Sequence, residues 1–330
     1  MKMRTLGKDG PTVSAIGLGC WSFAGAYGPT DSAESHRTLA RSLELGIDFL
    51  DTANVYGNGV SEEVIGAFIK DHPGLFKIAT KGGIYRPPET GKRIFENSPE
   101  HLRDALEASL RRLGVDYVDL YYIHRREPSR PIEEVMETLV RFKEEGKIGG
   151  IGFSEISPTS LKRAHAVHPV MAVQSEYSLW TRQPELGMIQ ATEALGVAFV
   201  PFSPLGRGIF STKAPEPESF GPQDFRKNNP RFLEPNFSDN LKAIQPFKTL
   251  AADLCATPAA LAIAWVLTSG DHLIPIPGTR SSDHLDEVAS AASLSLDADV
   301  LKQINSMLPP GFAYGHRYSD AQQIGVELYC

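Results

Sequence analysis

Short β-rich runs alternate with longer segments of helical periodicity along most of the chain. The runs predict strands near residues 16–18, 49–50, 76–80, 118–123, 150–153, 172–174, 198–202 and 273–276. The segments between them predict helices near residues 32–45, 61–70, 99–113, 131–145, 158–165, 185–195, 257–269 and 282–291. Eight strand–helix repeats in this order predict an α/β fold, namely a (β/α)8 TIM barrel.

Three of the predicted helices carry the same start signal. Ser98, Ser157 and Thr257 each stand directly before a proline. Proline suits the first position of a helix, where the backbone N–H would have no partner inside the helix, and a Ser or Thr before it caps the first turn. We therefore expect a helix to begin at each of these prolines.

Three segments lie outside the repeat. Residues 3–14 predict a small β-hairpin with its turn at residues 8–10. Residues 203–240 are rich in Pro, Gly, Phe and Asn, and they form a long loop after the seventh strand. Residues 308–330 form an irregular tail. We expect residues 1–330 to fold as one barrel domain, with the long loop and the tail over the barrel mouth.

A doubly wound sheet is the alternative α/β architecture. It predicts a glycine-rich turn that opens a helix directly after the first strand. Residues 17–22 read Gly-Leu-Gly-Cys-Trp-Ser, which lacks the third glycine of that motif. The pattern therefore favours the barrel.

The composition narrows the class of protein. The 330 residues are 42% hydrophobic, with 33 Lys and Arg against 40 Asp and Glu, for a net charge of −7. This balance argues against a general nucleic-acid or membrane-surface partner. Three cysteines without a CxxC pair favour a reduced compartment. With no apolar N-terminal leader and no 18-residue apolar stretch, we expect a cytoplasmic protein without a membrane span. The cysteines are Cys20, Cys255 and Cys330.

Four residues able to move or hold a proton stand at or near strand ends. Asp51 ends one predicted strand and Tyr56 follows five residues later, while Lys81 and His124 end two others. In a barrel of parallel strands the C-terminal ends converge on one mouth, where catalytic groups sit. A carboxylate, a phenol, an ammonium and an imidazole are therefore expected to share one pocket.

These four groups suit the protonation of a carbonyl oxygen. The reference pKa of a phenol is about 10, and the nearby Lys81 ammonium is expected to lower the pKa of Tyr56. Asp51 can pair with Lys81, and His124 can hydrogen-bond the substrate oxygen. Such a set needs no metal, but it needs a hydride carrier. Each residue also has an ordinary structural interpretation as a cap, a turn, a solvated lysine or a core histidine, and their joint placement favours the site.

Several motifs resemble those of a known family. Residues 51–62, Asp-Thr-Ala-Asn-Val-Tyr-Gly-Asn-Gly-Val-Ser-Glu, look like the signature of the aldo-keto reductases, and Lys81 and His124 fall where that family keeps its other two catalytic residues. Residues 17–21 open the chain in the family manner. Residues 174–180, 202–208 and 276–280 resemble its later motifs.

The resemblance implies a (β/α)8 barrel that binds NADPH, sometimes NADH, in an extended pose. It implies Tyr56 as the general acid, Asp51 and Lys81 as groups that tune it, and His124 as the group that orients a small carbonyl substrate. It implies a weaker role for Tyr177 near the nicotinamide. The residues that it places along the cofactor are Trp21, Ser154, Gln174, Ser203, Leu205, Gly206, Arg207, Gly278, Thr279, Arg280 and Glu287.

Two positions depart from the pattern of NADPH-using members. His284 stands where many of them have a basic residue, and Val288 stands where they have an Asn. Arg280 still offers a charged planar fork to a phosphate, so we favour NADPH and keep NADH as possible. Alternatively, Arg280 pairs with Asp283 or Glu287.

Two rival functions stay open at this stage. Lys81 could form a Schiff base in an aldolase-type lyase, or the barrel could act as a cofactor-sensing subunit of a channel. For the reductase, we expect pocket walls from Trp21, Phe23, Tyr85 or a residue near it, and the 203–240 loop. The sequence specifies neither the aldehyde or ketone nor the oligomeric state. His165 and His168 lack further ligands at metal spacing, so we expect no metal site.

Overall fold

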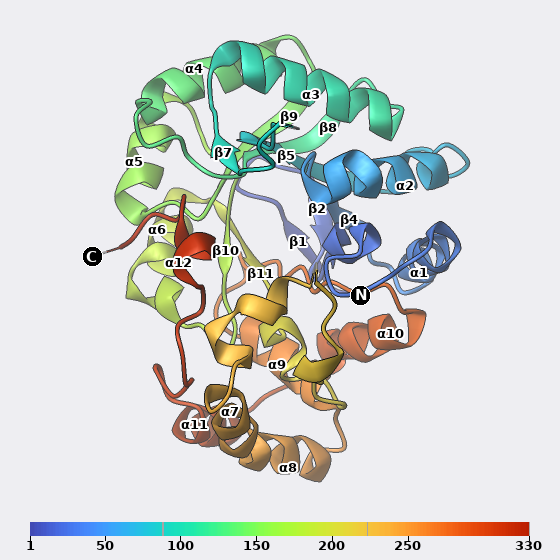
Figure 1. Cartoon of the computed structure of the whole chain (residues 1–330), viewed down its shortest axis with the longest axis vertical. Helices are drawn as coiled ribbons and strands as arrows, with labels where there is room; N and C mark the ends of the chain where they lie inside the picture. Colours follow the sequence, from blue (N-terminus) through green and yellow to red (C-terminus); the bar gives the residue numbers. More distant parts are fainter. Residues whose placement is uncertain (88, 223, 330) are drawn as a thin grey trace.

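A computed structural model describes residues 1–87, 89–222 and 224–329. Cys330, one of the three cysteines noted above, lies outside the described residues. Figure 1 shows strands at the centre of the molecule with helices arranged around them, as the strand–helix alternation predicts.

Seven parallel strands form the central sheet in the order β11-β10-β9-β8-β5-β4-β3. Residues 273–278 close it into a barrel through bridges to Phe199, Phe202 and Gly19. This closing segment is the predicted eighth strand. Prolines at positions 275 and 277 remove backbone donors, which explains why it pairs through isolated bridges only. The strands are β3 (Leu18–Gly19), β4 (Phe49–Asp51), β5 (Lys77–Gly82), β8 (Val118–Ile123), β9 (Ile148–Ser154), β10 (Ala172–Glu176) and β11 (Ala198–Phe202).

Helices surround the barrel and confirm the eight that the periodicity predicts. Ser98, Ser157 and Thr257 each accept a hydrogen bond from the backbone N–H three residues on, so all three predicted caps are confirmed. The helices are α1 (Ser32–Glu44), α2 (Val60–Ile69), α3 (Pro99–Leu113), α4 (Ile132–Glu144), α5 (Pro158–Val167), α6 (Met188–Leu195), α9 (Pro258–Leu267) and α10 (Ser282–Ser290).

An antiparallel hairpin closes the bottom of the barrel. Strands β1 (Met3–Thr5) and β2 (Thr12–Ser14) confirm the predicted hairpin. Leu6 and Val13 are fully buried, and they belong to the inner core cluster that fills the barrel. Because the hairpin fills the end at which the strands begin, the opposite end is left for a site.

Several elements were missed by the periodicity. A small hairpin, β6 (Ile84–Tyr85) and β7 (Ile94–Phe95), interrupts the segment between β5 and α3. The 203–240 segment is not one irregular loop, because it holds short 3-10 turns and ends in a helix. The additional helices are α7 (Asn236–Ala243), α8 (Gln245–Asp253), α11 (Ala298–Met307) and α12 (Asp320–Gln323). They are short, and Pro246 in the first turn of α8 separates it from α7, which weakens the periodic signal.

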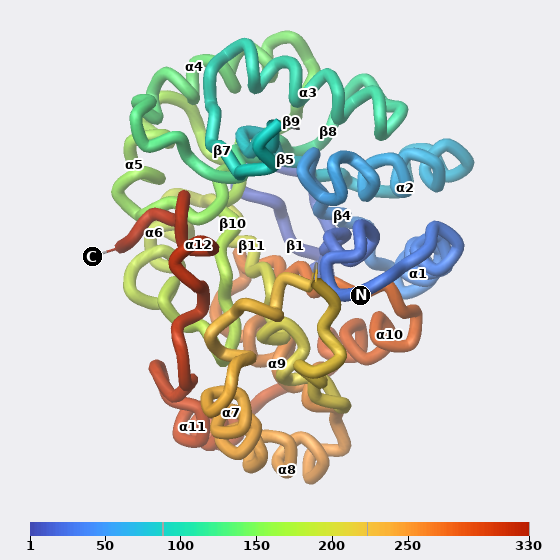
Figure 2. The backbone as a smooth tube through the Cα atoms, in the orientation of Figure 1, coloured from blue at the N-terminus to red at the C-terminus, as the bar shows by residue number. Residues whose placement is uncertain are grey.

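The tail runs along the loop that follows β11, as predicted. The Asn229 side chain in the loop donates a hydrogen bond of 2.6 Å to the Arg317 carbonyl in the tail. Figure 2 shows the tail (red) passing beside the ends of β10 and β11 and ending near α5. Both segments therefore cover the barrel mouth.

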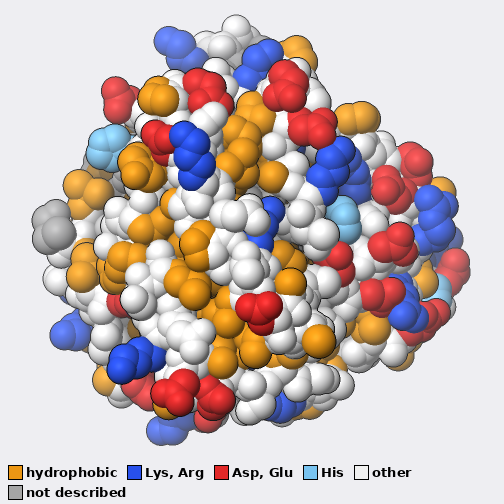
Figure 3. Space-filling model, turned by 90° about the horizontal axis from the view of Figure 1, so that it is seen from below, with side chains coloured by type: hydrophobic (Ala, Val, Ile, Leu, Met, Phe, Trp, Pro, Cys, Tyr) orange, Lys and Arg blue, Asp and Glu red, His pale blue; other side chains and the backbone are white. Residues whose placement is uncertain are grey.

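Charges of both signs are interspersed on the face in Figure 3. Among the described residues seen there, Lys and Arg stand beside Asp and Glu, with apolar side chains between them. Within the described ranges, no single helix is long and apolar enough to cross a membrane; only α7–α8 and α9 together meet that test, as a pair bent by 91°.

Candidate active site

The four residues singled out by the sequence meet at the barrel mouth. Asp51 is the last residue of β4, Lys81 lies near the end of β5, and His124 directly follows β8. Tyr56 begins a short 3-10 turn after β4. We refer to Asp51, Tyr56, Lys81 and His124 as the tetrad. Three neighbouring parallel strands therefore position Asp51, Lys81 and His124, and the turn after β4 positions Tyr56.

Lys81 connects the acid and the phenol. Its Nζ contacts the Asp51 carboxylate and donates hydrogen bonds to the Thr52 carbonyl at 2.8 Å and to the Tyr56 hydroxyl at 3.2 Å. Lys81 is 0% exposed and Asp51 2%. Gln174 Nε2 donates to the second Asp51 oxygen at 2.7 Å. Both carboxylate oxygens are thus occupied, which holds the lysine in place.

Tyr56 and His124 face one cavity of about 810 Å³. Their ring centroids lie 5.7 Å apart at an interplanar angle of 81°. Trp21 stacks on the other side of Tyr56 at 5.7 Å. A cavity of this volume, with a few convergent polar groups, is typical of a small-molecule site.

Burial and neighbouring charges set the protonation of the tetrad. Burial alone would lower the pKa of Lys81, but Asp51 and Tyr56 together outweigh it, and the net pKa is raised. Burial holds the pKa of His124 well below its usual value, and Lys81 lowers it further. At neutral pH the amine is therefore charged and the imidazole neutral.

The net pKa of Tyr56 contradicts one expectation. Lys81 does lower the pKa of the phenol, as predicted, but burial is the larger influence and raises it. Asp51 raises it further. Tyr56 is therefore a protonated phenol at neutral pH, which is the form a general acid needs.

The end of the cavity beside α10 holds the residues predicted to contact the nucleotide. Gly278, Thr279, Arg280 and Glu287 all line it, and so does His284, near the N-terminus of α10. Helix N-termini favour phosphate groups.

Arg280 spans one side of that end. Its Nη1 donates to the carbonyls of Tyr27 at 3.2 Å and Gly28 at 3.4 Å, and its Nε lies 3.9 Å from Glu34. The alternative pairing of Arg280 with residues of its own helix segment is wrong, because its carboxylate neighbour is Glu34 on α1.

The loop after β11 lines the middle of the cavity. Ser203, Leu205 and Arg207 border it, whereas Gly206 packs beside Trp180 and does not. Ser203 has a φ of 49° and Arg207 a φ of 58°, a region that non-glycine residues rarely adopt. Such backbone strain concentrates at ligand clamps.

Three residues predicted to lie along the cofactor either lie outside the cavity or already hydrogen-bond another side chain. The Arg207 guanidinium donates to Glu176 at 2.8 Å, although Arg207 also lines the cavity; its place beside a pyrophosphate stays a prediction. Tyr177 is away from the cavity, and its hydroxyl donates to Glu185 at 2.9 Å. Ser154 lines the cavity and accepts a hydrogen bond from Arg125.

The aromatic wall differs in part from the prediction. Trp21 lines the cavity, but Phe23 is buried in the core. Tyr85 is exposed and packs near His101, whereas its neighbours Ile84 and Arg86 line the cavity as expected for that segment. Besides Tyr56, the other Phe and Tyr residues that line it are Tyr27, Phe202, Phe220, Phe225 and Tyr318. Phe220 and Phe225 belong to the 203–240 loop that was expected to form a wall, whereas no local signal in the sequence singles out Tyr27 or Tyr318.

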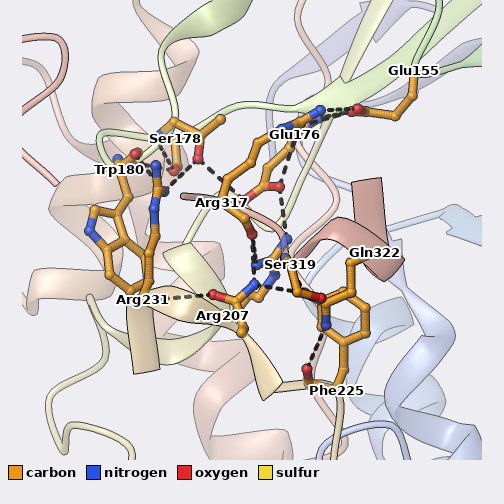
Figure 4. Close-up of polar contacts among 12 residues, drawn as sticks. Glu155, Glu176, Ser178, Trp180, Arg207, Phe225, Arg231, Arg317, Ser319 and Gln322 are labelled. Carbon is orange, nitrogen blue, oxygen red and sulfur yellow. Dashed lines mark hydrogen bonds and ion pairs between the residues drawn. The ribbon is translucent and has the colours of Figure 1, made fainter. Parts of the chain in front are cut away.

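A second buried charge cluster ties the tail to the barrel. Arg317 in the tail contacts the carboxylate of Glu155 and lies 3.4 Å from Glu176, which also accepts from Arg207. Figure 4 shows these side chains converging from β10, the segment after β9, the loop and the tail. The Arg207 guanidinium lies between the rings of Phe225 and Tyr318, about 5 Å from each centroid. We refer to Glu155, Glu176, Arg207 and Arg317 as the tail clamp.

Comparison with known proteins agrees with this architecture. The sequence profile of the Aldo/keto reductase family matches residues 15–309. The chain is 38% identical to the aldo-keto reductase yakc of Schizosaccharomyces pombe, whose name specifies NADP(+), over 96% of this chain and 94% of that relative. It is 41% identical to the probable aldo-keto reductase 1 of Glycine max, over 95% of this chain and 90% of that one.

A solved structure with the same fold is the glycerol dehydrogenase AKR11B4 from Gluconobacter oxydans. It superposes with a TM-score of 0.84 at 30% identity, covering 93% of this chain and 94% of that one. The (β/α)8 barrel together with this family match and these relatives identifies an oxidoreductase of the barrel class. The chain belongs to the aldo/keto reductase family.

Proposed function

We propose that this protein reduces aldehydes or ketones to alcohols with NADPH, with Tyr56 as the general acid. The observation that carries the proposal is the position of Lys81 Nζ, which hydrogen-bonds both Asp51 and the Tyr56 hydroxyl beneath a cavity. A phenol held this way can give up its proton, because the ammonium stabilises the phenolate that remains.

The residues along the cavity suit a nicotinamide dinucleotide. The tetrad and Ser154 lie at one end, and Arg280 and the start of α10 lie at the other, where phosphates are favoured. Gly19 and Gly278 line the cavity where two backbone segments pack closely together. A Cβ on Gly19 would stand 2.8 Å from the Ile276 carbonyl oxygen. The guanidinium of Arg280 favours the additional phosphate of NADPH over NADH, and NADH remains a weaker alternative. When bound, NADPH supplies a hydride.

The chain's own residues then handle the proton and the orientation. The carbonyl oxygen is expected to hydrogen-bond Tyr56 and His124. As the carbonyl carbon gains two electrons and a hydrogen, the C=O π pair moves to oxygen and takes the Tyr56 proton. The products are an alcohol and a phenolate, which Lys81 stabilises until solvent returns the proton. Asp51 keeps Lys81 charged and in place.

The lyase alternative has less support. A Schiff base requires a neutral amine, but Asp51 and Tyr56 raise the pKa of Lys81 and keep it an ammonium. No separate observation favours the channel-sensor alternative.

A carbonyl panel with both cofactors tests the proposal. We expect aldehydes to oxidise NADPH faster than NADH, with equimolar alcohol formed. Borohydride treatment in the presence of substrate should leave Lys81 unmodified. A stable adduct on Lys81 would favour the lyase. Tight NADPH binding without turnover of any carbonyl compound would favour the sensor, and either result would contradict the reductase.

A further inference from the structure

Three arginines from two neighbouring loops line the same cavity as the tetrad. Arg125 directly follows His124, Arg86 follows β6, and Arg93 precedes β7. We refer to them as the arginine cluster. None of the three forms an ion pair with a carboxylate in the part of the chain that the structure describes.

Arg125 is buried without an ion pair of its own among the described residues: it helps to lower the pKa of Glu155, but that carboxylate is paired with Arg317. Its Nη1 donates to the His124 carbonyl at 2.6 Å and to Ser154 Oγ at 2.9 Å. Its Nε is buried and has no hydrogen-bond partner among the described residues. The two buried arginines of the tail clamp, in contrast, are each paired with a glutamate. Burying an unpaired charge is costly, so a site of this kind favours an anion from outside.

The other two arginines extend the positive region toward the rim. Arg93 is half-buried, stacks over Phe95 at 5.1 Å, and donates to two tail carbonyls, at Ala321 and Ile324. Arg86 is exposed. The pKa of Arg93 is lowered by burial and then by Arg125 and Arg86, so the three like charges lie close enough to repel one another.

The cluster lies at the reacting end of the cavity. After burial and Lys81, the groups that lower the pKa of His124 are Arg125 and Arg93, and no carboxylate opposes them. The basic residue of the nucleotide end is Arg280, which contacts Tyr27, Gly28 and Glu34 instead. The arginine cluster is therefore placed to meet the substrate rather than the phosphates of a dinucleotide.

We propose that the arginine cluster binds a carboxylate carried by the carbonyl substrate, so that the enzyme prefers acid-bearing aldehydes or ketones to neutral ones. The Arg125 guanidinium, whose Nη2 makes no hydrogen bond among the described residues, can donate to a carboxylate, and Arg93 adds charge at the rim. This inference rests on the proposed reductase function and names its substrate class. An anion held here would also neutralise the excess positive charge beside His124.

A matched pair of aldehydes tests the inference in the NADPH-loaded enzyme. The probes are 4-carboxybenzaldehyde and its methyl ester, which differ in charge but share the reacting carbonyl. We expect kcat/KM to favour the acid by about ten-fold or more, through KM. Equal values would overturn the inference while leaving the reductase in place. No oxidation of NADPH by either aldehyde would contradict the proposed function itself, and this inference with it.

Variants test whether the arginine cluster causes the preference for the acid over its ester. Arg125→Met should reduce the acid-to-ester ratio to about one, and Arg125→Lys should restore part of it. If Arg125 only positions Ser154, the methionine variant would lower both values equally and keep the ratio, which would overturn the proposal. Arg93→Met should lower the acid-to-ester ratio by a smaller factor. This second variant tests the proposal even if Arg125→Met does not fold. Arg163→Gln, at an exposed pair with Glu133, serves as the control.

Discussion

The tetrad and the tail clamp are two buried charge clusters at the same barrel mouth, built for different purposes. Lys81 and Asp51 are as buried as Arg207 and Glu176, so burial does not distinguish them. In the tail clamp each arginine is matched by a glutamate. In the tetrad the lysine also reaches Tyr56, whose ring faces the cavity.

The two clusters also differ in the elements that carry their residues. Strand ends supply the tetrad, whereas the tail clamp joins β10 and the segment after β9 to the loop after β11 and the tail. A cluster built on one sheet can hold atoms in a fixed reacting geometry. A cluster built across chain segments fastens those segments, here the aromatic residues Phe225 and Tyr318 that close the cavity. On the proposed mechanism, the contrast teaches that a buried ion pair takes part in catalysis only where it leads to a group with access to substrate.

Breaking the Lys81–Asp51 pair should have the largest effect. Lys81→Met is expected to reduce turnover by about 100-fold or more, since the phenolate loses its ammonium. It should also lower the free energy of unfolding by about 3–5 kcal/mol, because Asp51 is left buried and unpaired. Steady-state kinetics and urea unfolding measure the two effects.

A double variant separates chemistry from stability. Asp51→Asn with Lys81→Met removes both charges, so it should regain most of the lost stability but none of the lost turnover. Recovery of turnover along with stability would mean that the pair is structural, like the tail clamp.

Opening the tail clamp should give the reverse pattern. Glu176→Gln leaves Arg207 without its carboxylate and should lower the free energy of unfolding by about 3 kcal/mol. Turnover of the folded enzyme should change by less than about ten-fold, because the tetrad is untouched. Glu133→Gln, in an exposed pair, is the matched control and should unfold like the wild type. A turnover loss as large as that of Lys81→Met would erase the distinction between the two clusters.

A smaller effect is expected at the far end of the cavity. Arg280→Ala should weaken NADPH binding by about ten-fold and NADH binding much less, because one charge-assisted phosphate contact is lost. Fluorescence titration of both cofactors measures this. Equal weakening would contradict a contact between Arg280 and the additional phosphate.

The pH profile should show the smallest change. Because the pKa of His124 lies well below 6.5 and that of Tyr56 lies above 10, neither group titrates between pH 7 and 9. The rate of carbonyl reduction should therefore vary by less than about two-fold there, and it should fall only as pH rises through the pKa of the phenol. Alcohol oxidation needs the phenolate and should instead accelerate with pH. A titration of the reduction rate near pH 6.5 would contradict the neutral imidazole.

The same contrast explains what the sequence could predict. The tetrad was predictable, because short strands end at recognisable residues and parallel strand ends converge. The tail clamp was not, since Arg317 pairs with Glu155 across 162 positions and no local pattern encodes that contact. Tyr318 was missed for the same reason, whereas Phe225 was expected only as part of the 203–240 loop. The direction of the Tyr56 pKa was mispredicted, because the extent of burial depends on the loop and tail that cover the mouth.

The most direct test is the rate of hydride transfer in Tyr56→Phe preloaded with NADPH, followed in a single turnover. The account predicts a rate at least about 100-fold below the wild type, with NADPH affinity and unfolding unchanged, and Tyr177→Phe indistinguishable from the wild type. A Tyr56→Phe rate within a few-fold of the wild type would show that the carbonyl oxygen takes its proton from another group.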